Sequence, residues 1–317
     1  MARTADTSTF KNWLKDQCGE CVSFDEPMSR HTSFKVGGPA EIFARPHTMD
    51  MACRIVLKAR ETGVPVFMAG DGTNLVVADR GIRGLVLVLH GIPSDVSFEE
   101  QTGGTVLVTA HAGVRTRTLC RLAIERGFRG MNFALGIPGT MGGNIAMNAG
   151  THLGAMDQVV HSIRVLLDNG DAETLDRQDL RFSYRKLDYP ARFGADSSPV
   201  IVGASLLLEK GDREQIHREA QEILQRRTAS QPVSLPNAGC IFKNPEGGEP
   251  AGKLIDMAGL KGRVKGGAMI SDRHANFILN TGNTRAEDIL SLIELAQKEV
   301  FDRFCVELET EVKRVDL

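Results

Sequence analysis

Apolar residues along the chain follow two spacings, one typical of helices and one typical of strands. Residues 49 to 63 carry apolar side chains at helical spacing and end in glycine, and the apolar run at 64 to 70 leads into a glycine turn. Further helices are predicted at 116 to 127 and 212 to 229, and strands at 84 to 89, 105 to 114, 162 to 168 and 199 to 210. This mixture predicts the α+β class.

The carboxyl-terminal part of the chain differs in its sequence pattern from the glycine-rich part before it. The change follows Gly211, so we place a domain boundary near residue 211. Near the end of the chain, Thr284 and Glu287 have the spacing of a capping box. They precede a predicted helix whose apolar stripe consists of Ile289, Leu292, Ile293, Ala296 and Val300.

The composition is that of an ordinary globular protein with nearly balanced charge. The 317 residues are enough for about two domains of roughly 100 to 200 residues each. The formal net charge is -2, so no basic excess favours a nucleic-acid partner. The amino-terminal MARTADTSTFKNWLKDQ lacks the apolar core of a signal peptide, and no segment stays apolar for the ~20 residues of a membrane span. We therefore expect a cytoplasmic protein.

Cysteine and histidine do not form a recognisable metal-binding pattern. The 6 cysteines should stay reduced in the cytoplasm, which favours packing or chemistry over disulfides. Cys18 and Cys21 form one C-x-x-C pair, which we interpret as incidental because no second pair completes a zinc site. The 8 histidines are scattered, with His111 and His161 in predicted strands. The sequence predicts no metal.

Three glycine-rich loops lie between the predicted elements: FKVGGPA (34 to 40), AGDGTNLVV (69 to 77) and GIPGTMGGNIAMNAG (136 to 150). Glycine permits positive φ angles and leaves space beside the backbone, so successive amide N–H groups can converge on an anion. The loops match neither the Walker motif nor the Rossmann G-x-G-x-x-G. A single loop is equally compatible with a tight turn, whereas three together suit one extended ligand with two phosphates.

Taken in order, these loops and several later segments resemble a known family. The later segments are FSYRK, NAGCIFKNP, AGKLIDMAGLKG, GGAMISDRHANFILN and LETEV. Together with SFKVGGPA and the other glycine loops, they look like the signature segments of UDP-N-acetylenolpyruvoylglucosamine reductase, over about residues 31 to 312. The resemblance implies the flavin enzyme that completes UDP-N-acetylmuramate for bacterial peptidoglycan.

The resemblance also implies a fold. After an amino-terminal segment at 1 to 30, we expect an FAD-binding fold of the vanillyl-alcohol-oxidase (PCMH) type at 31 to 211. Its two subdomains would cover about 31 to 85 and 86 to 211, and an α+β substrate-binding domain would follow at 212 to 317. FAD would be bound non-covalently. NADPH would be the reductant, at the site that the sugar nucleotide later occupies.

The residues that this resemblance assigns to FAD lie in two of the glycine loops. They are Gly70, Gly72, Thr73, Asn74, Gly136, Ile137, Pro138, Gly139, Thr140, Gly142 and Gly143. Asp71 is a departure, because the family usually carries an uncharged residue there. A carboxylate aimed at a pyrophosphate would repel it, so the Asp71 side chain should point away.

Two further residues match catalytic positions of the family. Hydride addition to the outer carbon of the enolpyruvyl double bond pushes negative charge toward the carboxylate. Arg185 in FSYRK matches an arginine whose guanidinium can hold that carboxylate with two parallel hydrogen bonds. Glu311 in LETEV matches a glutamate that would work best when protonated. Strand alternation would put Glu309 on the same face, and only the family pattern selects Glu311.

Cys240 is the main departure from the family. Many members carry serine as the proton donor where NAGCIFKNP has Cys240. A thiol, with an unperturbed pKa of about 8.5, gives up a proton more readily than an alcohol, so we expect Cys240 to be the donor. The thiol would also be sensitive to oxidation. A small buried thiol that only packs is the alternative.

Contacts to the UDP-sugar substrate are expected from Tyr184, Lys243, Asn244 and Lys253. Lys253 keeps a second interpretation, because a lone lysine near a loop is often only a solvated charge. The longer form of the family has an inserted loop with a tyrosine after FSYRK. Both tyrosines of this chain, Tyr184 and Tyr189, come too early for that loop, so the chain resembles the shorter form.

Two other functions would use the same loops. A related FAD-dependent oxidase often tethers FAD through a histidine or cysteine in a glycine loop, and these loops contain neither. A non-catalytic flavin-binding redox sensor could lose all three catalytic residues. Because Arg185 and Glu311 are present and Cys240 is chemically competent, the reductase is favoured. We infer no obligate protein partner.

Overall fold

A computed structural model describes residues 7–93, 96–167, 169–193, 199–232 and 234–316. The chain forms two compact units, each assembled from three separate segments. Unit 1 comprises Met1–Ser23, Ile42–Gly70 and Gly84–Gln225, and unit 2 comprises Phe24–Glu41, Asp71–Arg83 and Arg226–Leu317. These units interleave along the chain, whereas the domains expected from the sequence are contiguous, so the boundary near residue 211 stays a prediction.

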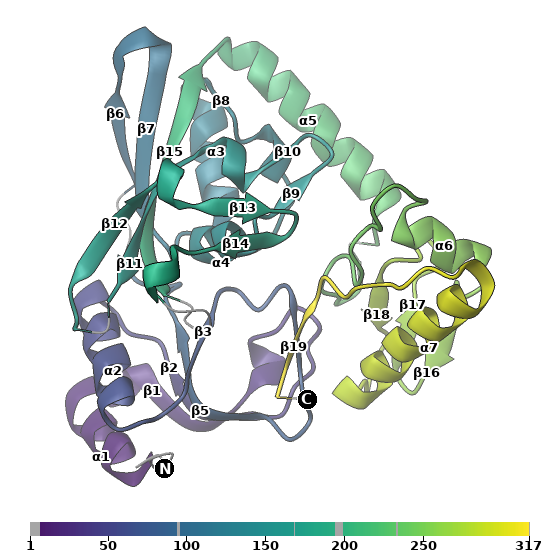
Figure 1. Ribbon diagram of the computed structural model, residues 1–317, viewed down its shortest axis with the longest axis horizontal. Helices are drawn as coiled ribbons and strands as arrows, with labels where there is room; N and C mark the ends of the chain where they lie inside the picture. Colours follow the sequence, from purple (N-terminus) through teal and green to yellow (C-terminus); the bar gives the residue numbers. More distant parts are fainter. Residues whose placement is uncertain (1–6, 94–95, 168, 194–198, 233, 317) are drawn as a thin grey trace. The chain divides into compact units, whose positions relative to one another are not determined.

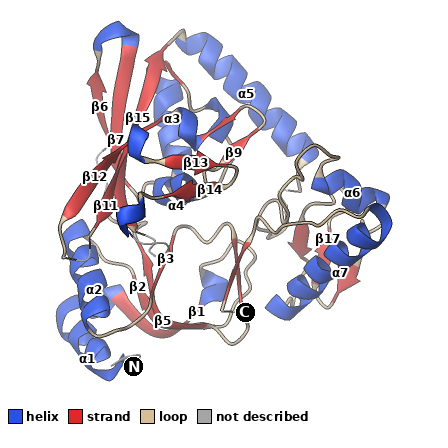
Figure 2. Ribbon diagram, viewed as in Figure 1, coloured by secondary structure: helices blue, strands red, loops and turns tan. Residues whose placement is uncertain are grey.

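An antiparallel sheet runs through unit 1 (Figures 1 and 2), with the strand order β12-β11-β15-β7-β6 and with β8 paired to β15. The strands are β6 (Ser97–Glu100), β7 (Thr105–His111), β8 (Phe128–Arg129), β11 (Val160–Leu166), β12 (Ala172–Asp176) and β15 (Val200–Lys210). Within β7, Val106, Val108 and Ala110 are buried and Thr109 is exposed, which follows the predicted period of two. The strands predicted around β7, β11 and β15 are confirmed, although residue 168 lies outside the described residues.

A second sheet has the order β1-β2-β5-β3, in which β3 and β5 are parallel. Its strands are β1 (Val22–Pro27), β2 (Pro39–Ala44), β3 (Val66–Ala69) and β5 (Ile82–Val88). Two short hairpins pair β9 (Gly150–Thr151) with β10 (Gly154–Ala155), and β13 (Arg181–Ser183) with β14 (Lys186–Asp188).

The helices that were predicted from apolar spacing are confirmed. They are α2 (Met49–Glu61), α3 (Thr116–Arg126) and α5 (Arg213–Ser230). Gly127 ends α3 with a φ of 72°, a conformation that glycine adopts without steric cost. Helix α1 (Thr7–Cys18) packs against α2, and the short α4 (Met141–Ala146) packs against β15.

Unit 2 has a core that joins distant parts of the sequence. Its elements are α6 (Ala251–Met257), α7 (Ala286–Phe304), an antiparallel sheet of β16 (Val264–Lys265), β17 (Ala268–Ile270) and β18 (Ile278–Asn280), and the parallel pair of β4 (Leu75–Val77) and β19 (Lys313–Val315). Phe34, Val36 and Val76 belong to the same buried cluster as α7. All five predicted stripe residues of α7 are at most 1% exposed, so that stripe is confirmed.

The capping box predicted at Thr284 and Glu287 is wrong. Helix α7 begins at Ala286, one residue later than that box requires, and the Thr284 hydroxyl instead donates to Asn280 Oδ1 at 2.8 Å. Asp288 supplies a local contact, because its carboxylate accepts the Arg285 N–H at 2.9 Å.

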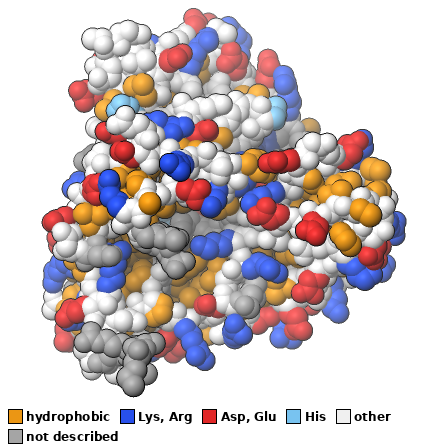
Figure 3. All heavy atoms as spheres, in the orientation of Figure 1, with side chains coloured by type: hydrophobic (Ala, Val, Ile, Leu, Met, Phe, Trp, Pro, Cys, Tyr) orange, Lys and Arg blue, Asp and Glu red, His pale blue; other side chains and the backbone are white. Residues whose placement is uncertain are grey.

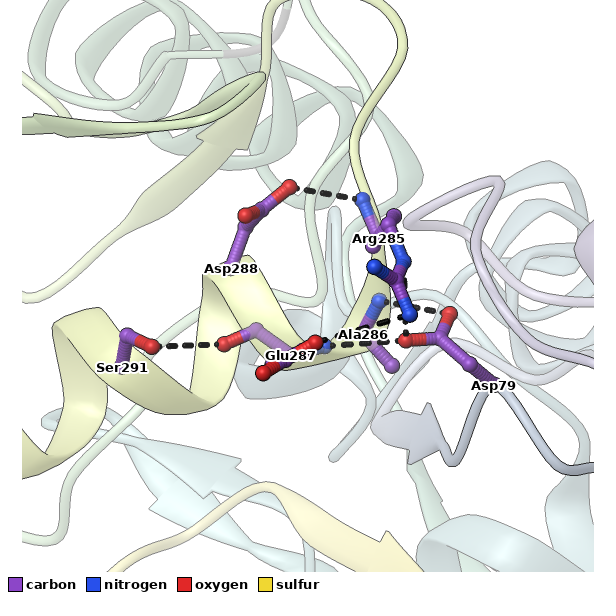
Figure 4. Close-up of polar contacts among 6 residues, drawn as sticks. All are labelled: Asp79, Arg285, Ala286, Glu287, Asp288 and Ser291. Carbon is purple, nitrogen blue, oxygen red and sulfur yellow. Dashed lines mark hydrogen bonds and ion pairs between the residues drawn. The ribbon is translucent and has the colours of Figure 1, made fainter.

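Asp79, from the loop after β4, supplies the main cap of α7 (Figure 4). Its two carboxylate oxygens accept the backbone N–H groups of Ala286 at 3.0 Å and of Glu287 at 3.2 Å. It also lies 3.7 Å from Arg285 Nε. A carboxylate here satisfies unpaired N–H donors and opposes the positive end of the helix dipole. The glycine-loop segment of unit 2 is thereby tied to α7.

Replacing Asp79 should weaken this cap. We expect Asp79→Ala to lower the free energy of unfolding by about 1 to 2 kcal/mol, the usual cost of losing an N-terminal cap. A urea titration followed by far-ultraviolet circular dichroism measures the change. Glu287→Gln is the matched control, because that side chain is 70% exposed in the same turn and should change stability by less than about 0.5 kcal/mol. Equal midpoints for Asp79→Ala and the unmodified protein would contradict the assignment.

Candidate active site

The third glycine loop begins helix α4 and lies against the residues that follow β7. The backbone N–H groups of Met141 and Gly142 donate to the carbonyls of Val114 and Ala112, both at 2.8 Å. A Cβ on Gly142 would lie 2.7 Å from the Ala112 Cβ. Only a glycine therefore allows the loop to approach this closely.

Gly70, directly after β3, meets the same loop in unit 1. Thr140 is the N-cap of α4, and its hydroxyl accepts the Gly143 N–H at 3.4 Å. A Cβ on Gly70 would lie 2.8 Å from that hydroxyl. Gly139 has a φ of 112°, which disfavours any residue with a side chain. The two loops thus present adjoining backbone without side chains, a surface that fits the pyrophosphate of FAD.

The remaining positions of this loop lie on its outer side. Gly136, Pro138 and Gly143 are exposed, and Ile137 is half-buried. The Pro138 carbonyl accepts a side-chain N–H of Asn144 at 3.3 Å, which ties the proline to α4. The loop is therefore anchored on one side and accessible on the other.

From Asp71 onward, the second glycine loop belongs to unit 2. A Cβ on Gly72 would lie 2.0 Å from the His31 carbonyl oxygen, so this position also requires glycine. The side-chain amide of Asn74 donates to the Glu311 carbonyl at 3.1 Å, and Thr73 beside it is half-buried. Asn74, predicted to contact FAD, therefore also fixes the backbone at Glu311.

Arg185 lies at the tip of the β13–β14 hairpin in unit 1. Ser183 pairs with Lys186, so Tyr184 and Arg185 form a two-residue turn. Arg185 has a φ of 59°, which is uncommon for a residue with a side chain, and such strain is concentrated at functional sites. Its guanidinium carbon lies 5.0 Å from the centre of the Tyr184 ring, and Tyr184 is 50% exposed.

The end of the glycine-rich segment orients this hairpin. Arg185 Nη2 donates to the Gly150 carbonyl at 2.9 Å, and Asn148 Nδ2 donates to the Ser183 carbonyl at 3.0 Å. Asn148 is 5% exposed and also accepts the Asp157 N–H at 3.0 Å. The sequence analysis did not single out Asn148. Its signal was a short polar residue two positions before Gly150, a type that tolerates the φ of 39° found here.

Cys240 begins an extended segment of unit 2 that forms hydrogen bonds with two other segments, one at Asn276 and one at Glu311. On one side, Ile241 donates to the Asn276 carbonyl at 2.9 Å, and the Asn276 side chain bonds both the N–H and the carbonyl of Phe242. On the other side, the Ile241 carbonyl accepts the Glu311 N–H at 2.7 Å. The backbone thus brings the segments of Cys240 and Glu311 together, and both side chains are half-buried.

Arg227, in the last turn of α5, interacts electrostatically with Cys240. Burial lowers the pKa of Arg227, and its interaction with the Cys240 charge opposes that shift. A cation that interacts with Cys240 would stabilise its thiolate. The sequence analysis singled out neither Arg227 nor Asn276, because their roles arise from contacts distant in sequence.

Glu309 and Glu311 have different surroundings. Lys243 donates its backbone N–H to the Glu309 carbonyl at 2.9 Å, and the two side chains form an ion pair. The Glu309 side chain is 73% exposed, whereas Glu311 is half-buried. The structure therefore places Glu309 with Lys243 and Glu311 beside the Cys240 segment.

The other predicted substrate residues lie around α6. Asn244 Oδ1 accepts the Ala251 N–H at 3.1 Å at the start of that helix. Lys253 Nζ lies 2.8 Å from Glu249 Oε1, with side chains 57% and 48% exposed. Figure 3 likewise shows Lys and Arg side chains beside Asp and Glu side chains over the face in view. An exposed pair of this kind adds little stability.

Two histidines lie in strands, and a third makes a structural contact. His111 and His161 lie in β7 and β11, as predicted. His274 Nδ1 accepts the Asn276 N–H at 3.3 Å, and burial lowers the pKa of His274, which favours the neutral ring. Within the described part of the chain, no group of three or more His, Cys, Asp and Glu side chains is arranged to hold a metal ion. No helix among the described residues has the length and apolarity to cross a bilayer.

Two known family models match the chain, one in its amino-terminal half and one near its carboxyl terminus. A model of the FAD binding domain matches residues 40–176. A model of the C-terminal domain of UDP-N-acetylenolpyruvoylglucosamine reductase matches residues 231–315. The first range contains both loops assigned to the flavin, and the second contains Cys240 and Glu311.

Individual relatives extend this similarity over nearly the whole chain. The UDP-N-acetylenolpyruvoylglucosamine reductase of Desulfosudis oleivorans is 44% identical over 96% of this chain and 97% of its own length. The enzyme of Alkaliphilus oremlandii is 41% identical over 93% and 94%. The crystal structure of UDP-N-acetylenolpyruvylglucosamine reductase from Thermus caldophilus is 32% identical, with a TM-score of 0.75 over 93% of this chain and 98% of that one.

These similarities confirm the α+β class, the FAD-binding fold of the vanillyl-alcohol-oxidase type and FAD as the cofactor. The protein is an FAD-containing oxidoreductase. Since relatives more than 30% identical are covered almost completely, the chain belongs to the UDP-N-acetylenolpyruvoylglucosamine reductase family.

Proposed function

We propose that the protein reduces the enolpyruvyl double bond of UDP-N-acetylglucosamine enolpyruvate to give UDP-N-acetylmuramate, with NADPH as the reductant. Bound FAD would supply the hydride chemistry that links NADPH to the enolpyruvyl substrate. Membership of the reductase family supports the reaction class. The observation that carries the proposal is the 2.7 Å bond between Ile241 and Glu311, because it holds a thiol and a carboxyl group on adjoining segments. The product assigns the reaction to the synthesis of peptidoglycan precursors.

We also propose the division of labour expected from the sequence. Residues 31 to 211 would bind FAD, and 212 to 317 would bind the substrate. The matched ranges 40–176 and 231–315 support this division. The residues proposed to hold FAD are Gly70, Gly72, Thr73, Asn74, Gly136, Ile137, Pro138, Gly139, Thr140, Gly142 and Gly143. The cytoplasmic location and the absence of an obligate protein partner stay predictions.

Arg185 would bind the carboxylate of the enolpyruvyl group. Its guanidinium carries five N–H donors, and the bond to the Gly150 carbonyl orients its plane. A planar guanidinium can then form two parallel hydrogen bonds with a carboxylate. Tyr184 beside it, together with Lys243, Asn244 and Lys253, would contact the UDP-sugar.

Cys240 would donate the proton that the inner carbon needs. Arg227 would stabilise the thiolate that remains, because opposite charge lowers the cost of ionisation. Glu311 is held through its N–H by Ile241 and through its carbonyl by Asn74. In its protonated form it would stabilise the negative charge that develops on the substrate carboxylate.

An anaerobic turnover experiment tests the proposed function. The holoenzyme is reduced with NADPH, enolpyruvyl-UDP-N-acetylglucosamine is added, and the absorbance of oxidised flavin is followed. We expect its rapid return together with one UDP-N-acetylmuramate per flavin, identified by mass spectrometry. If the flavin stays reduced until air is admitted, the proposed substrate is wrong and an oxidase is supported instead.

Substitution of Cys240 tests the proton donor. We expect Cys240→Ala to lower kcat by about 10²- to 10⁴-fold, the usual contribution of a general acid, while Cys240→Ser keeps much of the activity. Steady-state rates of NADPH oxidation with the substrate measure both. Cys305→Ser is the control, since Cys305 is exposed at the end of α7 and should leave kcat unchanged. Full activity of Cys240→Ala would remove Cys240 from the mechanism.

Substitution of Gly70 tests the flavin loops. The new Cβ of Gly70→Ala would lie 2.8 Å from the Thr140 hydroxyl, so one of the two loops must shift. We expect FAD to bind at least about tenfold more weakly, equivalent to 1.4 kcal/mol, as measured by the flavin content after dialysis. Gly248→Ala is the matched control, because its Cβ would meet nothing within 4 Å. Equal flavin content in both variants would contradict the proposed contact.

A further inference from the structure

Three sulfur atoms gather where helix α1 ends in unit 1. Cys18 is the last residue of α1, and Cys21 ends the short 3-10 helix η1 (Gly19–Cys21). The two thiols are close enough to interact electrostatically. The Cys18 thiol also donates to the thioether sulfur of Met51, with 3.6 Å between Sγ and Sδ. The C-x-x-C pair thus has a third sulfur neighbour that lies 33 residues further along the chain.

The packing of α1 on α2 brings this third sulfur into place. Met51 lies in the first turn of α2, where its backbone N–H donates to the hydroxyl of the N-cap Thr48 at 3.2 Å. One turn further along α2, Arg54 Nη2 donates to Gln17 Oε1 at 2.8 Å. Because these bonds flank the sulfur atoms on both helices, the cluster is held by the fold.

We propose that Cys18, Cys21 and Met51 form a binding site for one thiophilic monovalent cation, Cu(I). Thiolate and thioether ligands are soft donors, which select Cu(I) over the harder divalent ions. At the roughly 2.3 Å bond between zinc and thiolate, two sulfur ligands around one ion lie about 4 Å apart. The 3.6 Å separation of Cys18 Sγ and Met51 Sδ needs only a small adjustment to reach that spacing.

The surroundings favour a cation bound by two thiolates. Each Cu(I) that binds both cysteines as thiolates releases their two protons. The carbonyl end of α1 carries partial negative charge and attracts the ion. Arg54, whose charge favours the Cys18 thiolate, would balance the net negative charge of the complex. Met51 and Cys18 are both half-buried, so the site is not sealed from solvent.

A competition titration tests the site in the reduced holoenzyme. Cu(I) is added anaerobically in the presence of bicinchoninate, and the coloured chelator complex is read outside the flavin bands. We expect one Cu(I) per chain to be withheld from the chelator. X-ray absorption of the complex should show sulfur neighbours only. Stoichiometric binding with oxygen or nitrogen neighbours would overturn the proposal.

Variants assign the ligands. Loss of an outer-shell partner commonly weakens metal binding by about 10- to 100-fold, and loss of a direct ligand should cost at least as much. We therefore expect Cys18→Ser, Cys21→Ser and Met51→Leu each to weaken Cu(I) binding by at least about tenfold. Cys53→Ser is the matched control, because this half-buried cysteine lies on α2 two residues from Met51.

The remaining outcomes also decide the question. Binding that survives in the Cys18→Ser/Cys21→Ser double variant, or that is unchanged by Met51→Leu, would overturn the proposed ligand set. If the reduced protein withholds no Cu(I) and the two cysteines instead form a disulfide under mild oxidation, the pair is a redox couple and the metal site is wrong. Unchanged flavin spectra in the variants would show that the fold is intact.

Discussion

A single backbone hydrogen bond, from the Glu311 N–H to the Ile241 carbonyl at 2.7 Å, organises the part of the site that lies in unit 2. Asn276 holds the Cys240 segment on its other side, and the Asn74 side chain holds the Glu311 carbonyl at 3.1 Å. Four segments far apart in sequence share these bonds, so displacing one would move the others. Because the Cys240 segment takes part in this frame through its backbone, the side chain at position 240 can be a thiol in place of the serine that the family resemblance implies.

In unit 1, one glycine-rich segment has two structural tasks. Its first half gives α4 a close approach to Ala112 and Val114 and presents backbone without side chains beside Gly70. Its second half orients Arg185 through the bonds made by Asn148 and Gly150. The strained backbone of Arg185 is offset by these bonds. A stretch that looks uniformly glycine-rich thus joins the proposed flavin surface to the proposed carboxylate-binding arginine.

The cysteines differ in their electrostatic surroundings. Burial raises the pKa of Cys120 to about 12, and its thiol donates to the Met131 carbonyl in a packed interior. Cys240 is only half-buried and interacts with the Arg227 charge. A proton donor must also be stable after it has lost its proton, and a neighbouring cation meets that need. These surroundings fit the proposed role of Cys240 as the proton donor.

The sequence by itself determined most of the regular elements, because the spacing of apolar residues reports which face of a helix or strand is buried. The resemblance of its motifs also identified the family and its cofactor. The start of α7 was predicted wrongly because its cap comes from Asp79, 207 residues before Ala286. Likewise, strand spacing did not predict that Glu309 pairs with Lys243 while Glu311 joins the Cys240 segment, and the C-x-x-C pair showed nothing of Met51. Only the tertiary structure decided these points, since hydrogen bonds and ion pairs join residues by distance in space, whereas a sequence pattern records only neighbours along the chain.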